Sequence, residues 1–145
     1  MWQPDITVAA VCHQDNRFLL VEERSKSSGQ IVLNQPAGHL EDGESITEAV
    51  IRETLEETGC NFIPEAIVGL YRLRLNSGKT YIRYTFCGQV SEPLEDVTLD
   101  PDIIRTHWLT KAEIEKCTNL RSPLVSQCLD DYLLGNRYPL SLLCD

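Results

Sequence analysis

Short apolar runs near the N-terminus are the first pattern along this chain. Residues 6–12 read ITVAAVC and residues 18–21 read FLLV, with the polar residues 13–16 between them. Apolar runs of this length that are rich in β-branched side chains are typical of buried strands, and a short polar break is typical of a turn. The pattern predicts two strands joined by a tight turn.

Strand and helix patterns follow without a strict alternation. Residues 67–75 and 81–90 have strand character on either side of Asn76-Ser77-Gly78, which predicts a hairpin. Beyond it we expect an acidic loop at 91–102, a short strand at 107–109, a short helix over 110–115 and a C-terminal helix at about 122–134. This order disfavours a doubly wound parallel sheet and predicts an α+β fold, in which a few helices pack on a mixed sheet.

The strongest helical signal lies between Ser45 and Gly59. Ser45 followed three residues later by Glu48 is a capping box, which predicts a helix that begins near Ile46. Gly59 supplies the left-handed conformation that commonly ends a helix.

Three glutamates gather on one side of this helix. At ~100° per residue, Glu53, Glu56 and Glu57 fall within an arc of about 100°. Carboxylates this close repel one another, and the one neighbouring base, Arg52, balances only part of their charge. A pair of glutamates on a helix is ordinarily a solvated face, but convergent carboxylate oxygens are also the ligands that a hard divalent cation prefers. We therefore predict that these acids hold a metal ion.

Length, charge and cysteine usage restrict the function classes. A chain of 145 residues suits one domain over residues 1–145. The net charge of −9, from 13 Lys and Arg against 22 Asp and Glu, argues against binding to a nucleic acid polymer. No apolar run approaches the ~20 residues that span a bilayer, and the N-terminus has no signal-peptide pattern. The six cysteines are scattered without C-x-x-C pairs, which favours free thiols in a reducing compartment. We expect a cytoplasmic protein with no membrane partner, either a monomer or a homodimer.

Residues 38–60, which read GHLEDGESITEAVIRETLEETGC, resemble the signature motif of the Nudix family. The motif is G-x5-E-x7-R-E-U-x-E-E-x-G-U, where U is apolar, and the chain matches it at Gly38, Glu44, Arg52, Glu53, Glu56, Glu57 and Gly59. The two apolar positions hold Thr54 and Cys60, which are mild departures that leave the acids in place.

The resemblance implies a Nudix fold, in which a mixed sheet is sandwiched between helices, and a Nudix phosphohydrolase that acts on phosphorus-containing acid anhydrides. It implies that Mg²⁺, with Mn²⁺ as a substitute, binds Glu53, Glu56, Glu57 and the backbone carbonyl of Ala37. Arg52 is expected to orient these carboxylates, and the structural support of the motif is expected from Gly38, Glu44 and Gly59. The general base is left open among the three motif acids and the acids of the 95–102 loop.

Three further segments resemble a bacterial phosphatase branch of the family, which releases orthophosphate from nucleoside tri- and diphosphates. They are NQPAGHLE at 34–41, LRSPLV at 120–125 and RYPL at 137–140. Members of that branch also act on the diphosphate of hydroxymethylpyrimidine, a thiamine precursor. The partner is then a small phosphorylated molecule.

Substrate phosphates need cations, and the densest basic cluster of the chain is Arg72, Arg74, Lys79 and Arg83. Arg72 and Arg74 share one face of a strand, and they either converge on a phosphate tail or solubilise an exposed hairpin. Arg83 is the preferred contact and Arg121 the second, with Gln35 and Glu22 lining the pocket by resemblance.

Two other functions compete with an orthophosphate-releasing enzyme. One is a housekeeping Nudix hydrolase that releases pyrophosphate or a monophosphate. The other is a catalytically silent nucleotide sensor on the same fold, which would tolerate loss of the motif acids, although all of them are present. A simple Ca²⁺ binder is disfavoured because the acids lie on a helix and no D-x-D-x-D-G loop occurs.

Overall fold

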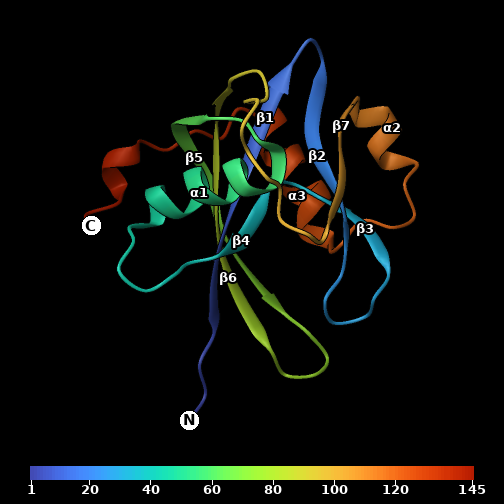
Figure 1. Ribbon diagram of the computed structural model, residues 1–145. Coiled ribbons are helices and arrows are strands. Elements are labelled where there is room, and N and C mark those ends of the chain that lie inside the picture. The colour runs from blue at the N-terminus through green and yellow to red at the C-terminus, as the bar shows by residue number, and fades with distance from the viewer.

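A seven-stranded mixed sheet lies at the centre of the computed structural model, which describes residues 1–145 (Figure 1). The strands are β1 (Asp5–Gln14), β2 (Arg17–Arg24), β3 (Ile31–Asn34), β4 (Ala37–His39), β5 (Phe62–Arg74), β6 (Thr80–Val90) and β7 (Ile103–Leu109). The helices are α1 (Ile46–Thr58), α2 (Lys111–Glu115), α3 (Pro123–Leu133) and the short 3-10 helix η1 (Leu140–Leu142). The order along the sheet is β3-β2-β1-β6-β5, with β4 paired to β1 and β7 paired to β2. β1 and β6 are parallel, and the other pairs are antiparallel.

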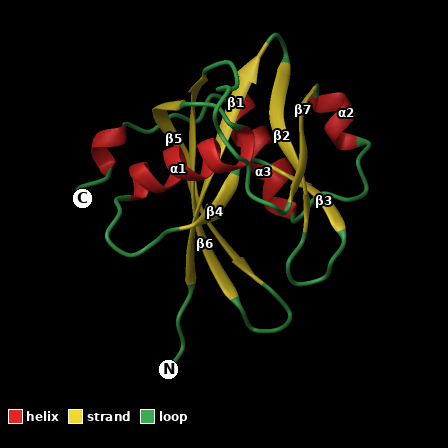
Figure 2. Cartoon of the chain, viewed as in Figure 1, coloured by secondary structure: helices red, strands yellow, loops and turns green.

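Helices cover both faces of the sheet (Figures 1 and 2). Alternate side chains of β1 point to opposite faces, as the pleat of a strand requires. Val8 and Ala10 belong to the apolar cluster that includes α1, whereas Val11 belongs to the cluster that includes Leu124 and Leu129 of α3. The predicted mixed sheet between helices is therefore confirmed.

Local signals locate most elements correctly. The capped helix over 46–58, the hairpin at Asn76-Ser77-Gly78 and the C-terminal helix are all observed. β5 begins at Phe62 rather than near residue 67, because Pro64 and Glu65 interrupt the apolar pattern while the strand continues through two bulges. The sequence pattern does not predict β3 and β4.

The cysteines do not form disulfides, as their scattered spacing predicts. All six cysteines are free thiols, and Cys12, Cys60, Cys87 and Cys128 are buried. None of the helices has the length and apolar character needed to cross a bilayer.

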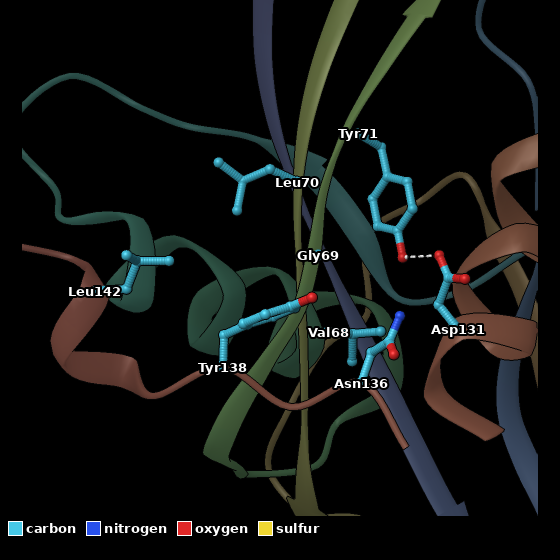
Figure 3. Close-up of a pocket in the computed structure, with 8 residues that line it drawn as sticks. All are labelled: Val68, Gly69, Leu70, Tyr71, Asp131, Asn136, Tyr138 and Leu142. Atoms are coloured by element: carbon cyan, nitrogen blue, oxygen red, sulfur yellow. Dashed lines mark hydrogen bonds between the residues drawn. The ribbon is translucent and has the colours of Figure 1, made fainter. Parts of the chain in front are cut away.

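A hollow of about 350 Å³ lies between β5 and residues 136–142, and Figure 3 shows Tyr71 and Asp131 hydrogen-bonded at its edge.

Candidate active site on the central helix

Both ends of α1 are fixed by local interactions. Ser45 Oγ accepts the N–H of Glu48 at 3.0 Å, and Glu48 Oε1 accepts the N–H of Ser45 at 3.3 Å, so the predicted capping box is present. Gly59 takes a left-handed conformation with φ of 74° and donates its N–H to Leu55. Ala49 and Val50 are fully buried against the sheet. The face that carries the acids is consequently held in one orientation.

Gly38 on β4 lets Glu53 lie directly against the strand. A Cβ atom on residue 38 would stand 2.1 Å from the carboxyl carbon of Glu53, far inside van der Waals contact. Glycine is therefore needed at position 38 for a close approach between strand and helix rather than for an unusual φ. The fixed spacing between Gly38 and Glu53 in the motif has a direct geometric reason.

Arg52 lies at the centre of the acids. Its guanidinium donates to Glu44 at 2.7 and 2.9 Å, to Glu53 Oε1 at 2.8 Å and to Glu56 Oε2 at 3.1 Å. It also donates to the carbonyl of His39 at 3.0 Å, which ties the strand to the helix. The hydrogen bonds from Arg52 lower the pKa of Glu44, so Glu44 stays ionised.

Glu57 is the most buried of the acids, with 6% of its surface exposed. Its Oε1 accepts the backbone N–H of Ala37 at 2.9 Å. Burial raises the pKa of Glu57 well above its ordinary value, and the charges of Glu23, Glu53 and Asp100 raise it further. Burial likewise raises the pKa of Glu53, against the opposing effect of Arg52. Negative charge is thus concentrated and poorly compensated at this point of the molecule.

Two acids outside the motif act on Glu57, and the fold selects one of them from the candidates of the 95–102 loop. Asp100 donates its backbone N–H to the carbonyl of Glu56 at 2.9 Å, which lays the 91–102 loop along α1. Its negative charge raises the pKa of both Glu53 and Glu57. The second residue is Glu23, which adjoins Glu22 on β2, the residue that the resemblance expected to line the substrate pocket. Glu22 instead pairs with His107 at 2.7 Å, because neighbouring residues of a strand point to opposite faces.

The chemistry of these side chains fits a divalent cation. They offer only hard oxygen donors, and a single guanidinium serves Glu44, Glu53 and Glu56. No group of three or more His, Cys, Asp or Glu side chains is gathered closely enough to ligate one ion. The hydrogen bonds explain this, because Glu53 and Glu56 turn to Arg52 while Glu57 turns to Ala37. A cation shared by the three acids would require these carboxylates to turn away from their present partners.

The predicted substrate contacts Arg83 and Gln35 form a buried pair. Arg83 is 7% exposed and donates to Gln35 Oε1 at 3.2 Å, while Gln35 Nε2 donates to the carbonyl of Val125 at 2.9 Å. No protein atom accepts a hydrogen bond from Nε of Arg83. Arg121 binds Glu23 at 2.9 Å. These basic groups are therefore held by amide and carboxylate partners.

The remaining basic residues do not form one cluster with Arg83. The register of β5 and β6 pairs Arg83 with Tyr71 but pairs Arg72 with Ile82, and paired residues share a face of the sheet. Arg72 and Arg74 do share a face, as expected, but it is the face opposite to Arg83, and both are exposed. Lys79 binds Asp5 at 3.1 Å. Arg83 and the exposed pair of Arg72 and Arg74 are therefore separate candidates for a phosphate contact.

Comparisons with known proteins agree with this geometry. Residues 1–127 match the family described as the NUDIX domain. The chain is 37% identical over its full length to "Phosphatase NudJ" of Escherichia coli K12 and of Shigella boydii, and it covers 94% of each. Among solved structures it resembles a NUDIX hydrolase from Nitrosomonas europaea, at 50% identity and a TM-score of 0.94 over 99% of this chain and 97% of that one. A MutT NUDIX hydrolase from Burkholderia pseudomallei, at 19% identity and a TM-score of 0.75 over 90% of this chain and 98% of that one, shares the fold.

Proposed function

Because this chain belongs to the NUDIX hydrolase family, we propose that it hydrolyses phosphoanhydride bonds of nucleoside tri- and diphosphates or of similar small diphosphates, such as hydroxymethylpyrimidine diphosphate. Nudix hydrolases act on small phosphorylated substrates and generally use a divalent metal. We assign Mg²⁺ to this role, with Mn²⁺ as a substitute, and orthophosphate as the product. The full-length identity to proteins named phosphatases supports the choice of product.

One observation carries the proposal. Glu53 lies against Gly38 with its carboxyl carbon 2.1 Å from where a Cβ on residue 38 would stand, and Glu57 is buried beside Ala37. Burying carboxylates is costly unless a cation or hydrogen bonds compensate them. A buried carboxylate of this kind is expected where its oxygens bind a metal ion. We assign that role to Glu53 and Glu57, together with Glu56 and the carbonyl of Ala37.

The chain's own groups divide the work of the proposed reaction. A divalent cation on these oxygens would neutralise the phosphate charge and make a bound water more acidic. Arg52 keeps Glu53 and Glu56 oriented through its bonds of 2.8 and 3.1 Å. An oxygen of Glu53 or Glu57 then accepts the proton of the attacking water, and Asp100 is the alternative acceptor from the loop.

Substrate binding is assigned first to the buried Arg83 and to the exposed Arg121. The Nε–H of Arg83, which has no protein acceptor, would donate to a substrate oxygen, and Gln35 holds the guanidinium in place. Arg121 would supply a second cation. Lys79, Arg72 and Arg74 are secondary contacts, because the first is bound to Asp5 and the others lie on the opposite face.

Replacing Glu57 by Gln tests the assignment of the acids. The amide oxygen of the substituted side chain can still accept the N–H of Ala37, so the fold is expected to remain. The kcat is expected to fall by orders of magnitude because a ligand charge and a proton acceptor are lost. Glu92→Gln, the same change at an exposed glutamate, is the matched control and should leave kcat unchanged. Near-normal turnover of Glu57→Gln at saturating Mg²⁺ contradicts the assignment.

The product distinguishes the competing functions. Phosphorus NMR on a panel of nucleoside di- and triphosphates, nucleotide sugars and pyrimidine diphosphates identifies what is released. Orthophosphate supports the proposal, pyrophosphate or a monophosphate indicates the housekeeping hydrolase, and saturable binding without turnover indicates a sensor.

We assign the reaction to the cytoplasm of a bacterium, because the relatives are bacterial and all six cysteines are free thiols.

A further inference from the structure

Residues 136–145, which we call the strap, connect the end of α3 to the start of α1. Figure 1 shows this red segment passing β5 and ending beside the first turn of α1. Tyr138 and Ile67 exchange two backbone hydrogen bonds of 2.8 Å each, so the strap pairs with the outer edge of β5. Figure 3 shows Tyr138 and Leu142 next to Gly69 and Leu70 of that strand. The strap is therefore attached to the sheet before it reaches the helix.

The strap also packs on the core beneath α1. Leu140 and Leu143 contact the apolar cluster that contains Ala49 and Val50 of α1. Ile46, the first residue of the helix, packs against the same cluster. Side chains from the strap and from the first turns of α1 thus share one apolar environment.

Asp145 ends this path with a polar contact to the helix. Its Oδ2 accepts the backbone N–H of Ile46 at 2.9 Å. The first N–H groups of a helix have no partner within the helix, and the capping box of Ser45 and Glu48 satisfies the N–H groups of those two residues only. Asp145 supplies the acceptor for Ile46 and also puts a negative charge at the positive end of the helix dipole.

The position of α1 along its axis matters for the acids that it carries. Glu53 lies against Gly38 with no space to spare, and Glu57 accepts a hydrogen bond of 2.9 Å from Ala37. A helix moves as a rigid unit, so a shift of its first turn is transmitted to both carboxylates. Misplacement of reacting groups by about 1 Å costs on the order of 100-fold in rate.

We propose that Asp145 is a positioning residue for the hydrolytic reaction: by binding the N–H of Ile46 from the strap, it fixes the first turn of α1 and thereby the placement of Glu53 and Glu57. The inference rests on the proposed hydrolase function of these acids. Asp145 does not touch the reacting atoms, and it acts through the helix.

Steady-state kinetics of Asp145→Ala, Asp145→Asn and Asp145→Glu test this role, with thermal unfolding measured in parallel. We expect about a fivefold fall in kcat for Asp145→Ala, which is about 1 kcal/mol in activation free energy. KM should change little. Asp145→Asn keeps a hydrogen-bond acceptor without the charge, so its kcat should lie between those of the wild type and Asp145→Ala. Asp145→Glu keeps both the acceptor and the charge, so its kcat should be within about twofold of the wild type.

Two controls separate positioning from general stability. Cys144→Ser alters the neighbouring exposed residue of the strap and should leave kcat and KM unchanged. Assays run well below the unfolding temperature of every variant exclude loss of folded protein as the cause. Amide exchange at Ile46 should be faster in Asp145→Ala.

The outcomes are distinguishable. An active wild type with an equally active Asp145→Ala, or a variant in which only KM changes, overturns this inference alone. A wild type without turnover on any substrate overturns the proposed function and the inference together.

Discussion

Gly38→Ala is the sharpest perturbation of the site, because a single methyl group would enter the space of Glu53. The added Cβ would lie 2.1 Å from the carboxyl carbon and 2.3 and 2.4 Å from the two carboxylate oxygens. Ordinary contact starts near 3.4 Å, so the carboxyl carbon must move by about 1.3 Å, which is 3.4 − 2.1. A displacement of this size at a reacting group predicts a fall in kcat/KM of about 100-fold or more.

The same substitution should cost little stability. The crowded atoms are at the far end of a flexible side chain, so the carboxylate can swing away instead of forcing the backbone apart. It then loses the 2.8 Å hydrogen bond from Arg52, and Arg52 keeps both bonds to Glu44. We expect a loss of about 1–2 kcal/mol in the free energy of unfolding.

Urea unfolding and steady-state kinetics on the same preparations measure the two effects. The double variant Gly38→Ala/Glu53→Asp is a useful companion, because the shorter acid makes room for the methyl group. It should regain stability without regaining activity. If Gly38→Ala keeps a third or more of the wild-type kcat/KM, the close packing of Glu53 on β4 is not needed for catalysis.

Three other perturbations probe groups around the site. Arg83→Ala should raise KM by about 10- to 100-fold, because a charged hydrogen-bond donor to the substrate is lost. Arg72→Ala, on the opposite face of the sheet, should change KM by less than about twofold. Equal changes in KM for the two variants contradict the assignment of Arg83 as the main substrate contact. His39 and Lys79 lower the pKa of Asp5 from 3.8, so this carboxylate stabilises the fold above that pH and the benefit is lost as the pH falls through the lower folded value. Urea unfolding from pH 2 to 6 should therefore show wild type and Asp5→Asn converging at the acidic end, and a constant difference excludes the linkage. Tyr71→Phe removes a 2.7 Å hydrogen bond and should cost about 1–2 kcal/mol of stability with kcat unchanged, and an altered kcat would connect the hollow near β5 to catalysis.

The helix and its acids were predictable because their signals are local. Ser45, Glu48 and Gly59 set the limits of α1 through hydrogen bonds that span a few residues. The placement of Glu53, Glu56 and Glu57 on one side of the helix follows from helical spacing alone. Rules of this kind do not depend on distant parts of the chain.

What sequence reasoning missed depends on pairing between distant segments. β3 and β4 are short and include polar or small residues, so they carry no alternating pattern, and they form only because β2 and β1 offer backbone partners. The different surroundings of Glu22 and Glu23 depend on the opposite faces of β2 to which neighbouring side chains point. The separation of Arg83 from Arg72 depends on the register of β5 against β6.

Glu53, Glu56 and Glu57 are expected to share a divalent cation, and titration with Mn²⁺ measures that binding. Titration calorimetry on the wild type and on Glu57→Gln compares the same fold with and without one buried charge. We predict saturable binding to the wild type, competed by Mg²⁺, that is weaker by at least about tenfold in Glu57→Gln. No saturable binding to the wild type at millimolar Mn²⁺, or equal affinity for the two proteins, contradicts a metal site on these three acids.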